Sequence, residues 1–198
     1  VERYNSAVVS EVEQIQALSQ GVPLTASYLA RHPDALRLPD TGHLDTMISY
    51  MLEPVSPHLR ITVRAALEAL CVLQAFRDEQ MVQTLLDTYS QTSRGRSLLA
   101  GTEPLPSSDE VVKMLVYQGM ARYEVSLGAY ALDEHLRHLV RSFLPRCEPD
   151  QRSWQTLHRT ALDLYKLWTA KYEDEDSKAG WSAEIEYHKK AIASLSLS

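Results

Sequence analysis

The sequence predicts a mainly α-helical protein in which a helical subdomain, a winged-helix domain with a β-hairpin wing and a C-terminal helical hairpin follow one another. Three observations predict this fold class. A capped helix over residues 107–118 runs directly into two short β-prone segments. Two helices with apolar faces precede it, and two long amphipathic helices follow. The expected boundaries are 1–54 for the subdomain, 55–147 for the winged helix and 148–198 for the hairpin.

Apolar residues at helical spacing predict three helices in residues 1–54. Gly21 ends the first helix, and Pro23 begins the second at the position where a missing N–H has no cost. Tyr28 and Leu29 face inward from this second helix. A polar loop through residues 39–42 leads to the third, whose inward residues are Leu44, Met47, Ile48, Met51 and Leu52. Three helices of this size bury little apolar surface, so we do not expect the subdomain to be stable alone.

The first helix of the winged-helix domain begins at Pro57, which follows Ser56 as a proline follows a helix cap. This helix carries an apolar face from Leu59 to Leu73, and Asp78 caps the second helix. The connection between residues 90 and 106 is polar, with one turn expected at Leu98 and Leu99.

The third helix carries the strongest local signals. Ser107 and Glu110 have the spacing of a capping box, and Gly119 is placed to close the helix in left-handed geometry. Its expected apolar stripe consists of Val111, Val112, Leu115 and Val116. The runs 120–125 and 129–132 then form the wing around a glycine-containing turn. Asp133 caps the helix that follows.

The last third predicts two antiparallel helices joined by an acidic linker over residues 173–177. Their apolar stripes each need a partner, so the pair is similar to the first unit of a TPR-like helical repeat. His158 and His188 fall on facing positions, and we expect a polar contact between them. The two stripes are Trp154, Leu157, Ala161, Leu164 and Trp168, and Trp181, Ile185, His188, Ile192 and Leu195.

Composition excludes several function classes. The formal net charge of −6 disfavours nucleic acid and anionic membranes as partners of the whole surface. No phosphate-binding loop is present, so this chain is not expected to be an enzyme or an NTPase by itself.

His135 and His138 are read as exposed helix residues, and no metal is expected. Without a signal peptide or membrane span, a cytoplasmic location is expected, and Val1 suggests a piece of a longer chain.

The charge pattern bears on whether the winged helix reads DNA. Between residues 107 and 118 the only cation is Lys113, opposed by Asp109 and Glu110, and in the wing Arg122 faces Glu124. A major-groove reader presents more cations and amides than this. A basic patch would have to be built from Arg94, Arg96, Arg137, Arg141 and Arg146. This pattern favours protein contact over nucleic acid.

The order of parts resembles the regulatory half of STAND-type signalling ATPases, the group that includes the NB-ARC switches. Gly21-Val22-Pro23 between two helices is similar to the G-x-P motif of that family. Residues 130–137 are similar to the end of the family's wing, with Asp133 where the family usually has His. The segment 181–188 is similar to the W-x-x-E-x-x-Y-H segment that opens the helical sensor of some members.

The resemblance implies a regulatory role. In it Pro23 lies against the adenine of ADP or ATP, while Asp133 and Arg137 stand at the phosphate end. The nucleotide and its Mg²⁺ would be bound by a nucleotide-binding domain earlier in the parent chain, and this fragment would hold no cofactor of its own. Two alternatives remain open: a winged-helix transcription regulator that binds DNA, and a helical module that docks a partner on the stripe around Trp154, Trp168 and Trp181.

Overall fold

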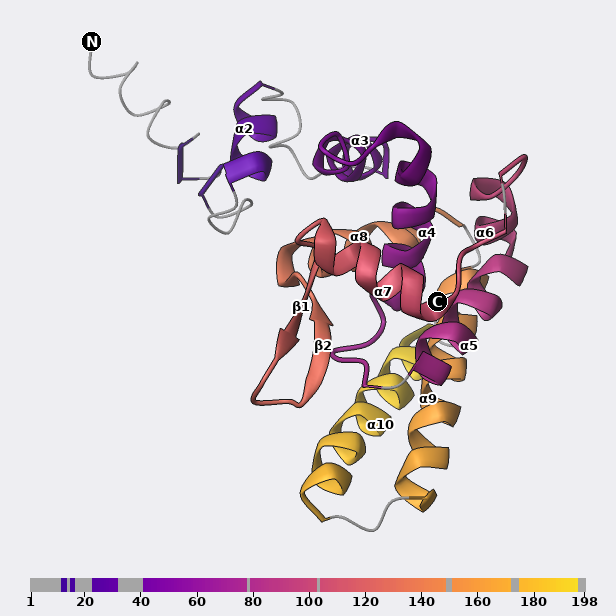
Figure 1. Ribbon diagram of the computed structural model, residues 1–198. Coiled ribbons are helices and arrows are strands. Elements are labelled where there is room, and N and C mark those ends of the chain that lie inside the picture. Colours follow the sequence, from indigo (N-terminus) through magenta and orange to yellow (C-terminus); the bar gives the residue numbers. More distant parts are fainter. Residues whose placement is uncertain are drawn as a thin grey trace. The chain divides into compact units, whose positions relative to one another are not determined.

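A computed structural model describes residues 12–13, 15–16, 23–31, 41–77, 79–102, 104–148, 151–171 and 175–195. The chain divides into two compact units, Val1–Pro57 and His58–Ser198, and each is described by itself. The predicted fold class is confirmed, because the chain is mainly helical with one small β-hairpin and a C-terminal helical hairpin (Figure 1).

The first unit contains the helices α2 (Pro23–Arg31) and α3 (Thr41–Met51), which contact each other. The rings of Tyr28 and Tyr50 lie 5.6 Å apart across this contact. Each residue predicted to face inward from α3 is buried, as are Tyr28 and Leu29. The predicted loop is wrong at Thr41 and Gly42, which already belong to the first turn of α3. Gly21 lies outside the described residues.

In the second unit, a 3₁₀ turn η2 (Pro57–Leu59) leads into α4 (Arg60–Leu70), which packs against α5 (Glu79–Gln91). From Val63 to Leu73 every residue of α4 and its C-terminal turn is buried, so α4 is the central helix of this unit. The connection after α5 contains a short helix, α6 (Ser93–Leu98), capped by Thr92, so the turn predicted at Leu98 and Leu99 is the end of a helix that begins at Ser93.

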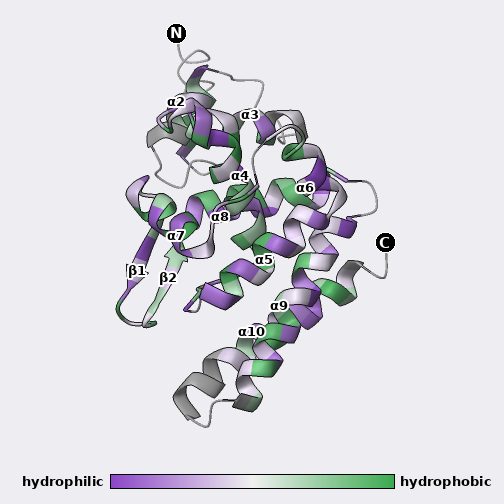
Figure 2. Ribbon diagram, turned by 45° about the vertical axis from the view of Figure 1, so that its right-hand side comes forward, coloured by the Kyte–Doolittle hydropathy of each residue, from purple (hydrophilic) through white to green (hydrophobic). Residues whose placement is uncertain are grey.

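The third helix and the wing form as predicted. The capping box of Ser107 and Glu110 is present at the start of α7 (Ser108–Tyr117), and Gly119 follows the helix with φ +69°. The strands β1 (Ala121–Glu124) and β2 (Ala129–Leu132) pair antiparallel. Figure 2 colours β1 mostly purple and β2 pale green, which agrees with a hydrophilic outer strand and an apolar inner one. The prediction that Val112 and Val116 lie in the core is wrong, because Val112 is half-buried and Val116 is 40% exposed.

A third, one-residue strand was not predicted. The backbones of Phe76 and Tyr130 exchange two hydrogen bonds of 2.8 and 3.0 Å, which forms an antiparallel bridge to β2. The two rings stack with centroids 6.1 Å apart. This bridge ties the segment between α4 and α5 to the wing, so the wing has a fixed base on the helical core.

The rest of the second unit is helical: α8 (Glu134–Phe143), a 3₁₀ turn η3 (Leu144–Arg146), α9 (Arg152–Lys171) and α10 (Glu175–Leu195). The helices α9 and α10 form the predicted antiparallel hairpin, and α9 packs along α5 (Figure 1). Green and purple patches alternate along α9 in Figure 2, as expected of a helix with one buried face. The predicted linker is wrong at residues 175–177, which already belong to α10, while residues 172–174 lie outside the described part.

Candidate functional site

The residues predicted to meet a nucleotide fall in different units. Pro23 begins α2 in the first unit, and Asp133 and Arg137 lie one turn apart at the start of α8 in the second. The Asp133 carboxylate accepts hydrogen bonds of 3.1 Å from the backbone N–H groups of His135 and Leu136. Asp133 is therefore the cap of α8, as predicted from its position.

Arg137 turns toward the interior of the second unit. Its Nε donates to the carbonyl oxygen of Cys71 at 3.2 Å, and its Nη2 is buried without a hydrogen-bond partner. Burial, followed by the charge of the neighbouring Arg141, lowers the pKa of Arg137 below its ordinary value. Nη2 of this half-buried side chain is thus a buried donor without a partner, which is a costly arrangement.

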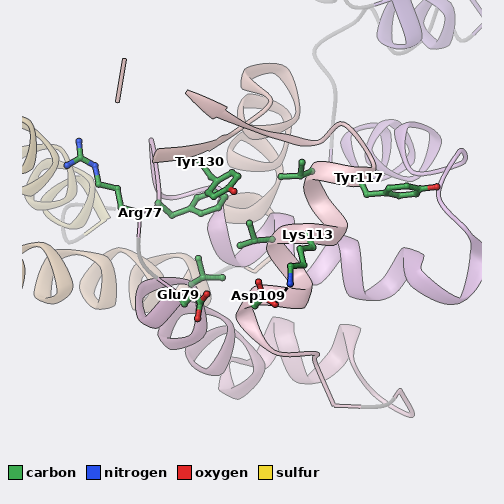
Figure 3. A pocket seen from close by; sticks show the side chains of 10 residues that line it. Arg77, Glu79, Asp109, Lys113, Tyr117 and Tyr130 are labelled. Atoms are coloured by element: carbon green, nitrogen blue, oxygen red, sulfur yellow. Dashed lines mark hydrogen bonds and ion pairs between the residues drawn. The ribbon is translucent and has the colours of Figure 1, made fainter. Parts of the chain in front are cut away.

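The outward face of α7 carries a pocket of about 420 Å³ between α5, α7 and β2. Its apolar lining comes from Phe76, Val82, Val112, Val116 and Tyr130, and its charged lining from Arg77, Glu79, Asp109 and Lys113. In Figure 3, Asp109 and Lys113 meet on α7 while Tyr117, which also lines the pocket, points away from the other labelled side chains. A DNA-binding winged helix inserts the outward face of this helix into the DNA groove, and in this chain that face is largely apolar.

Three cations on or near α7 and the wing are paired within the chain, and one of them, Arg94, belongs to the predicted basic patch. Lys113 pairs with Asp109 at 2.5 Å, and Arg122 pairs with Glu124 in the wing. Arg94 is half-buried and makes two hydrogen bonds to the Glu68 carboxylate, of 2.9 and 2.8 Å. These three pairs reduce the positive charge on and near α7 and the wing, while Arg96 of the predicted patch is exposed.

Glu68 is fully buried near the C-terminal end of α4 and forms a polar cluster that sequence reasoning missed. Besides Arg94, it accepts hydrogen bonds from Arg64 at 2.9 Å and from the Tyr89 hydroxyl at 2.6 Å. Burial alone would raise the pKa of Glu68, but the bonds from Arg94 and its other partners outweigh burial and hold it below the usual value. The guanidinium groups of Arg64 and Arg94 lie 5.2 and 5.1 Å from the Phe143 ring centre.

A second buried polar cluster joins α8 to the C-terminal hairpin, and we call it the polar junction: Arg137 and Arg141 from α8, His158 from α9, and Glu184, Tyr187 and His188 from α10. The predicted histidine contact is confirmed, with the two Nδ1 atoms 2.8 Å apart. Both imidazoles are fully buried. Burial is the main cause that lowers the pKa of His158 to about 3 and that of His188 to about 4.

Several buried polar atoms of the polar junction have no hydrogen-bond partner. Nε2 of both histidines and one Glu184 oxygen are buried without a hydrogen-bond partner, as is Nη2 of Arg137. Glu184 and His188 approach to 3.7 Å, beyond hydrogen-bonding distance. The Arg141 guanidinium lies 4.9 Å from the Tyr187 ring centre and bonds its hydroxyl. Sequence reasoning missed Glu184, although its position one turn before His188 was a usable signal.

One face of the segment 181–188, which carries the family resemblance, is turned to the interior. Trp181, Glu184 and His188 are buried, and Tyr187 is half-buried beside Arg141. Trp154 and Trp168 are also buried within the hairpin. The tryptophan stripe proposed as a docking surface is therefore occupied by the chain's own packing.

The described residues hold no group of three or more His, Cys, Asp or Glu side chains that fits a metal ion. Cys71 and Cys147 are both free, and burial raises the pKa of the Cys147 thiol to about 11, so it is not an activated nucleophile. Among the helices of the described ranges, none has the length and apolar character needed to cross a membrane.

The chain was compared with protein families, with curated proteins and with solved structures, and none of these comparisons gave a match.

Proposed function

We propose that this chain is a non-catalytic regulatory segment of a STAND-type signalling ATPase. It would couple the ADP or ATP state of a nucleotide-binding domain in the same polypeptide to conformational change and protein–protein contact in the cytoplasm. The order of a helical unit, a winged helix and a helical hairpin supports this proposal. So does the contact between Arg141 of α8 and Tyr187 of α10, which joins the hairpin to α8.

The observation that carries the proposal is the chemistry of α7 and the wing. Their cations are paired within the chain, and the outward face of α7 holds a mainly apolar pocket. Apolar surface that is open on a folded domain typically marks a site of protein contact. A duplex-binding surface needs several unpaired cations for phosphates and exposed polar groups for bases. The same fold with this surface favours a protein partner.

The DNA-binding alternative loses support at the residues that would have carried it. Arg94 donates hydrogen bonds to the buried Glu68, and Arg141 contacts Tyr187 within the polar junction. Releasing either cation to a phosphate would leave a buried carboxylate unpaired or break the contact between α8 and α10. We therefore do not retain DNA binding as the second candidate.

The polar junction is the element best placed to transmit a signal. Arg137 has one buried donor without a partner, and a phosphate oxygen near the start of α8 would supply the missing acceptor. Arg141, which contacts Tyr187 of α10, lies one turn from Arg137 on α8. A movement of Arg137 and α8 toward such a phosphate would therefore pull α8 away from α10. The adenine contact of Pro23 and the phosphate contacts of Asp133 and Arg137 stay predictions in this scheme.

The test uses the natural chain extended upstream by roughly two hundred residues, about the size of one domain. It is purified without added nucleotide and denatured, and the released nucleotide is quantified. The proposal predicts near-stoichiometric ADP, lost in a variant of the upstream phosphate loop and reduced by Arg137→Gln. Leu167→Gln, an exposed change on α9, is the matched control and should retain full ADP. A folded extension without nucleotide would contradict the proposal.

A further inference from the structure

A small pocket of about 110 Å³ lies among the wing, the segment after α4 and the helical hairpin, and it is separate from the pocket on α7. Three aromatic rings line it, from Tyr165 and Trp168 on α9 and Trp181 on α10. Glu184 lines it beside Trp181, and Leu127 of the wing turn and the exposed Arg77 also belong to its wall, with Gln74 and Ala75 of the segment after α4. The volume is several times what one water needs, so it admits a small branched group.

The aromatic rings meet at steep angles. The Trp168 and Trp181 centroids are 6.1 Å apart with 59° between the ring planes, and those of Tyr165 and Trp168 are 6.4 Å apart with 80°. The three rings that line the pocket therefore do not lie in one plane and meet it in different orientations. This arrangement attracts alkylammonium cations, because the negative π faces attract the cation and its methyl groups pack against the rings.

Glu184 adds the opposite charge that such a ligand needs. The residue is only 6% exposed, and one of its carboxylate oxygens has no hydrogen-bond partner. A buried carboxylate without a partner is expensive, and native proteins normally satisfy it with a donor, an ion or a ligand. Arg137 lies near enough to act on its charge, but its Nε donates to the Cys71 carbonyl oxygen instead. Nε2 of His188 lies 3.7 Å from this oxygen, so among the described residues the carboxylate has a buried imidazole beside it and no arginine or lysine paired with it.

We propose that this pocket binds an alkylammonium group, held by the rings of Tyr165, Trp168 and Trp181 and by the carboxylate of Glu184. A trimethylammonium head is compact enough for the pocket and has no N–H that needs an acceptor. Arg77 works against binding, because its positive charge lies on the same wall. The inference does not depend on the proposed regulatory function, since it rests on this pocket alone.

The first experiment compares two ligands of the same shape on the unmodified 198-residue chain. Choline carries the trimethylammonium cation, and 3,3-dimethylbutan-1-ol replaces the nitrogen by carbon and has no charge. Binding is followed by the ¹⁵N-bound indole protons of Trp154, Trp168 and Trp181 in NMR titrations. We expect choline to bind at least about tenfold more tightly than the alcohol and to shift the Trp168 and Trp181 signals much more than that of Trp154. Equal binding of both ligands, no binding of choline, or a shift confined to Trp154 would overturn the proposal.

Two variants test the roles of the charges. Glu184→Gln keeps the size of the side chain and should weaken choline binding at least about tenfold while leaving the alcohol unaffected. Unchanged choline binding in this variant would overturn the proposal. If Glu184→Gln does not fold, Arg77→Gln provides the test, because Arg77 is exposed. Removing its like charge should tighten choline binding about twofold or more at low salt, and weaker binding would contradict the scheme.

A final comparison identifies the source of the cation. A short peptide with one trimethyllysine is titrated beside choline under the same conditions. Tighter binding of the peptide would mark the pocket as a reader of a modified protein side chain. Tighter binding of choline would mark it as a site for a free quaternary amine. Both results support the shared alkylammonium chemistry.

Discussion

The buried histidine pair should make the second unit unstable in mild acid. His158 and His188 are fully buried, and burial lowers their pKa values to about 3 and about 4. In the unfolded chain each titrates near 6.5. As the pH falls from 7 to 5, the unfolded chain therefore takes up protons at both positions while the folded chain does not. Proton uptake by the unfolded state favours unfolding, so stability falls with pH in this window.

The magnitude follows from the same pKa values. Between pH 7 and pH 5, each histidine lowers the free energy of unfolding by about 2 kcal/mol. Glu184 acts in the opposite direction, because burial raises its pKa to about 6 and the folded state then binds its proton first. Over the same pH interval, this carboxyl group raises the free energy of unfolding by about 1 kcal/mol. We expect a net loss of about 3 kcal/mol in the free energy of unfolding from these groups.

Urea unfolding followed by tryptophan fluorescence measures this loss directly. The chain has three tryptophans, Trp154, Trp168 and Trp181, so the signal reports on α9 and α10. His188→Gln should reduce the pH-dependent loss by about 2 kcal/mol, whatever its effect on stability at pH 7. His138→Gln, an exposed change on α8, is the matched control and should keep the wild-type dependence. A wild-type stability that is flat or rises from pH 7 to 5 would refute the reasoning.

Three further predictions concern packing and surface. Glu68→Gln should cost about 3 kcal/mol in urea unfolding, because it leaves the buried Arg64 and the half-buried Arg94 without their carboxylate, whereas Glu124→Gln in the exposed wing pair should cost less than about 1 kcal/mol. Gly95→Ala should destabilise by more than about 2 kcal/mol, since its Cβ would lie 1.9 Å from the Tyr89 carbonyl oxygen, while Ser97→Ala in the same helix should be nearly neutral. Tyr117→Asp should leave the melting temperature within a few degrees of wild type, because this side chain is 88% exposed, and a drop of ten degrees would show that it packs in the core.

The sequence predicted those features that depend on nearby residues. The capping box of Ser107 and Glu110, the left-handed Gly119 and the Asp133 cap each need only three or four residues to recognise, and each is present. The wing followed from two short β-prone runs around a turn. The His158–His188 contact could be predicted because two regular amphipathic helices in a hairpin bring facing positions together.

Features formed by distant residues were missed. The Phe76 strand is a single bridge and shows no alternation in sequence. The Glu68 cluster needs partners 21 and 26 residues away along the chain, which no local pattern records. Val112 and Val116 repeat at the spacing of core residues, but the helix has a second apolar face that opens onto a pocket. Periodicity predicts that a face is apolar and does not tell whether the chain itself covers it.

The most direct test of the regulatory proposal measures whether the winged helix responds to nucleotide. Hydrogen exchange of the upstream-extended chain is compared with ADP bound and with a non-hydrolysable ATP analogue bound. The proposal predicts that amides of α8 and of α10 around Glu184 exchange faster in the ATP-analogue state, because α8 moves away from the hairpin. Tight nucleotide binding with identical exchange in α8 and α10 in both states would contradict the coupling.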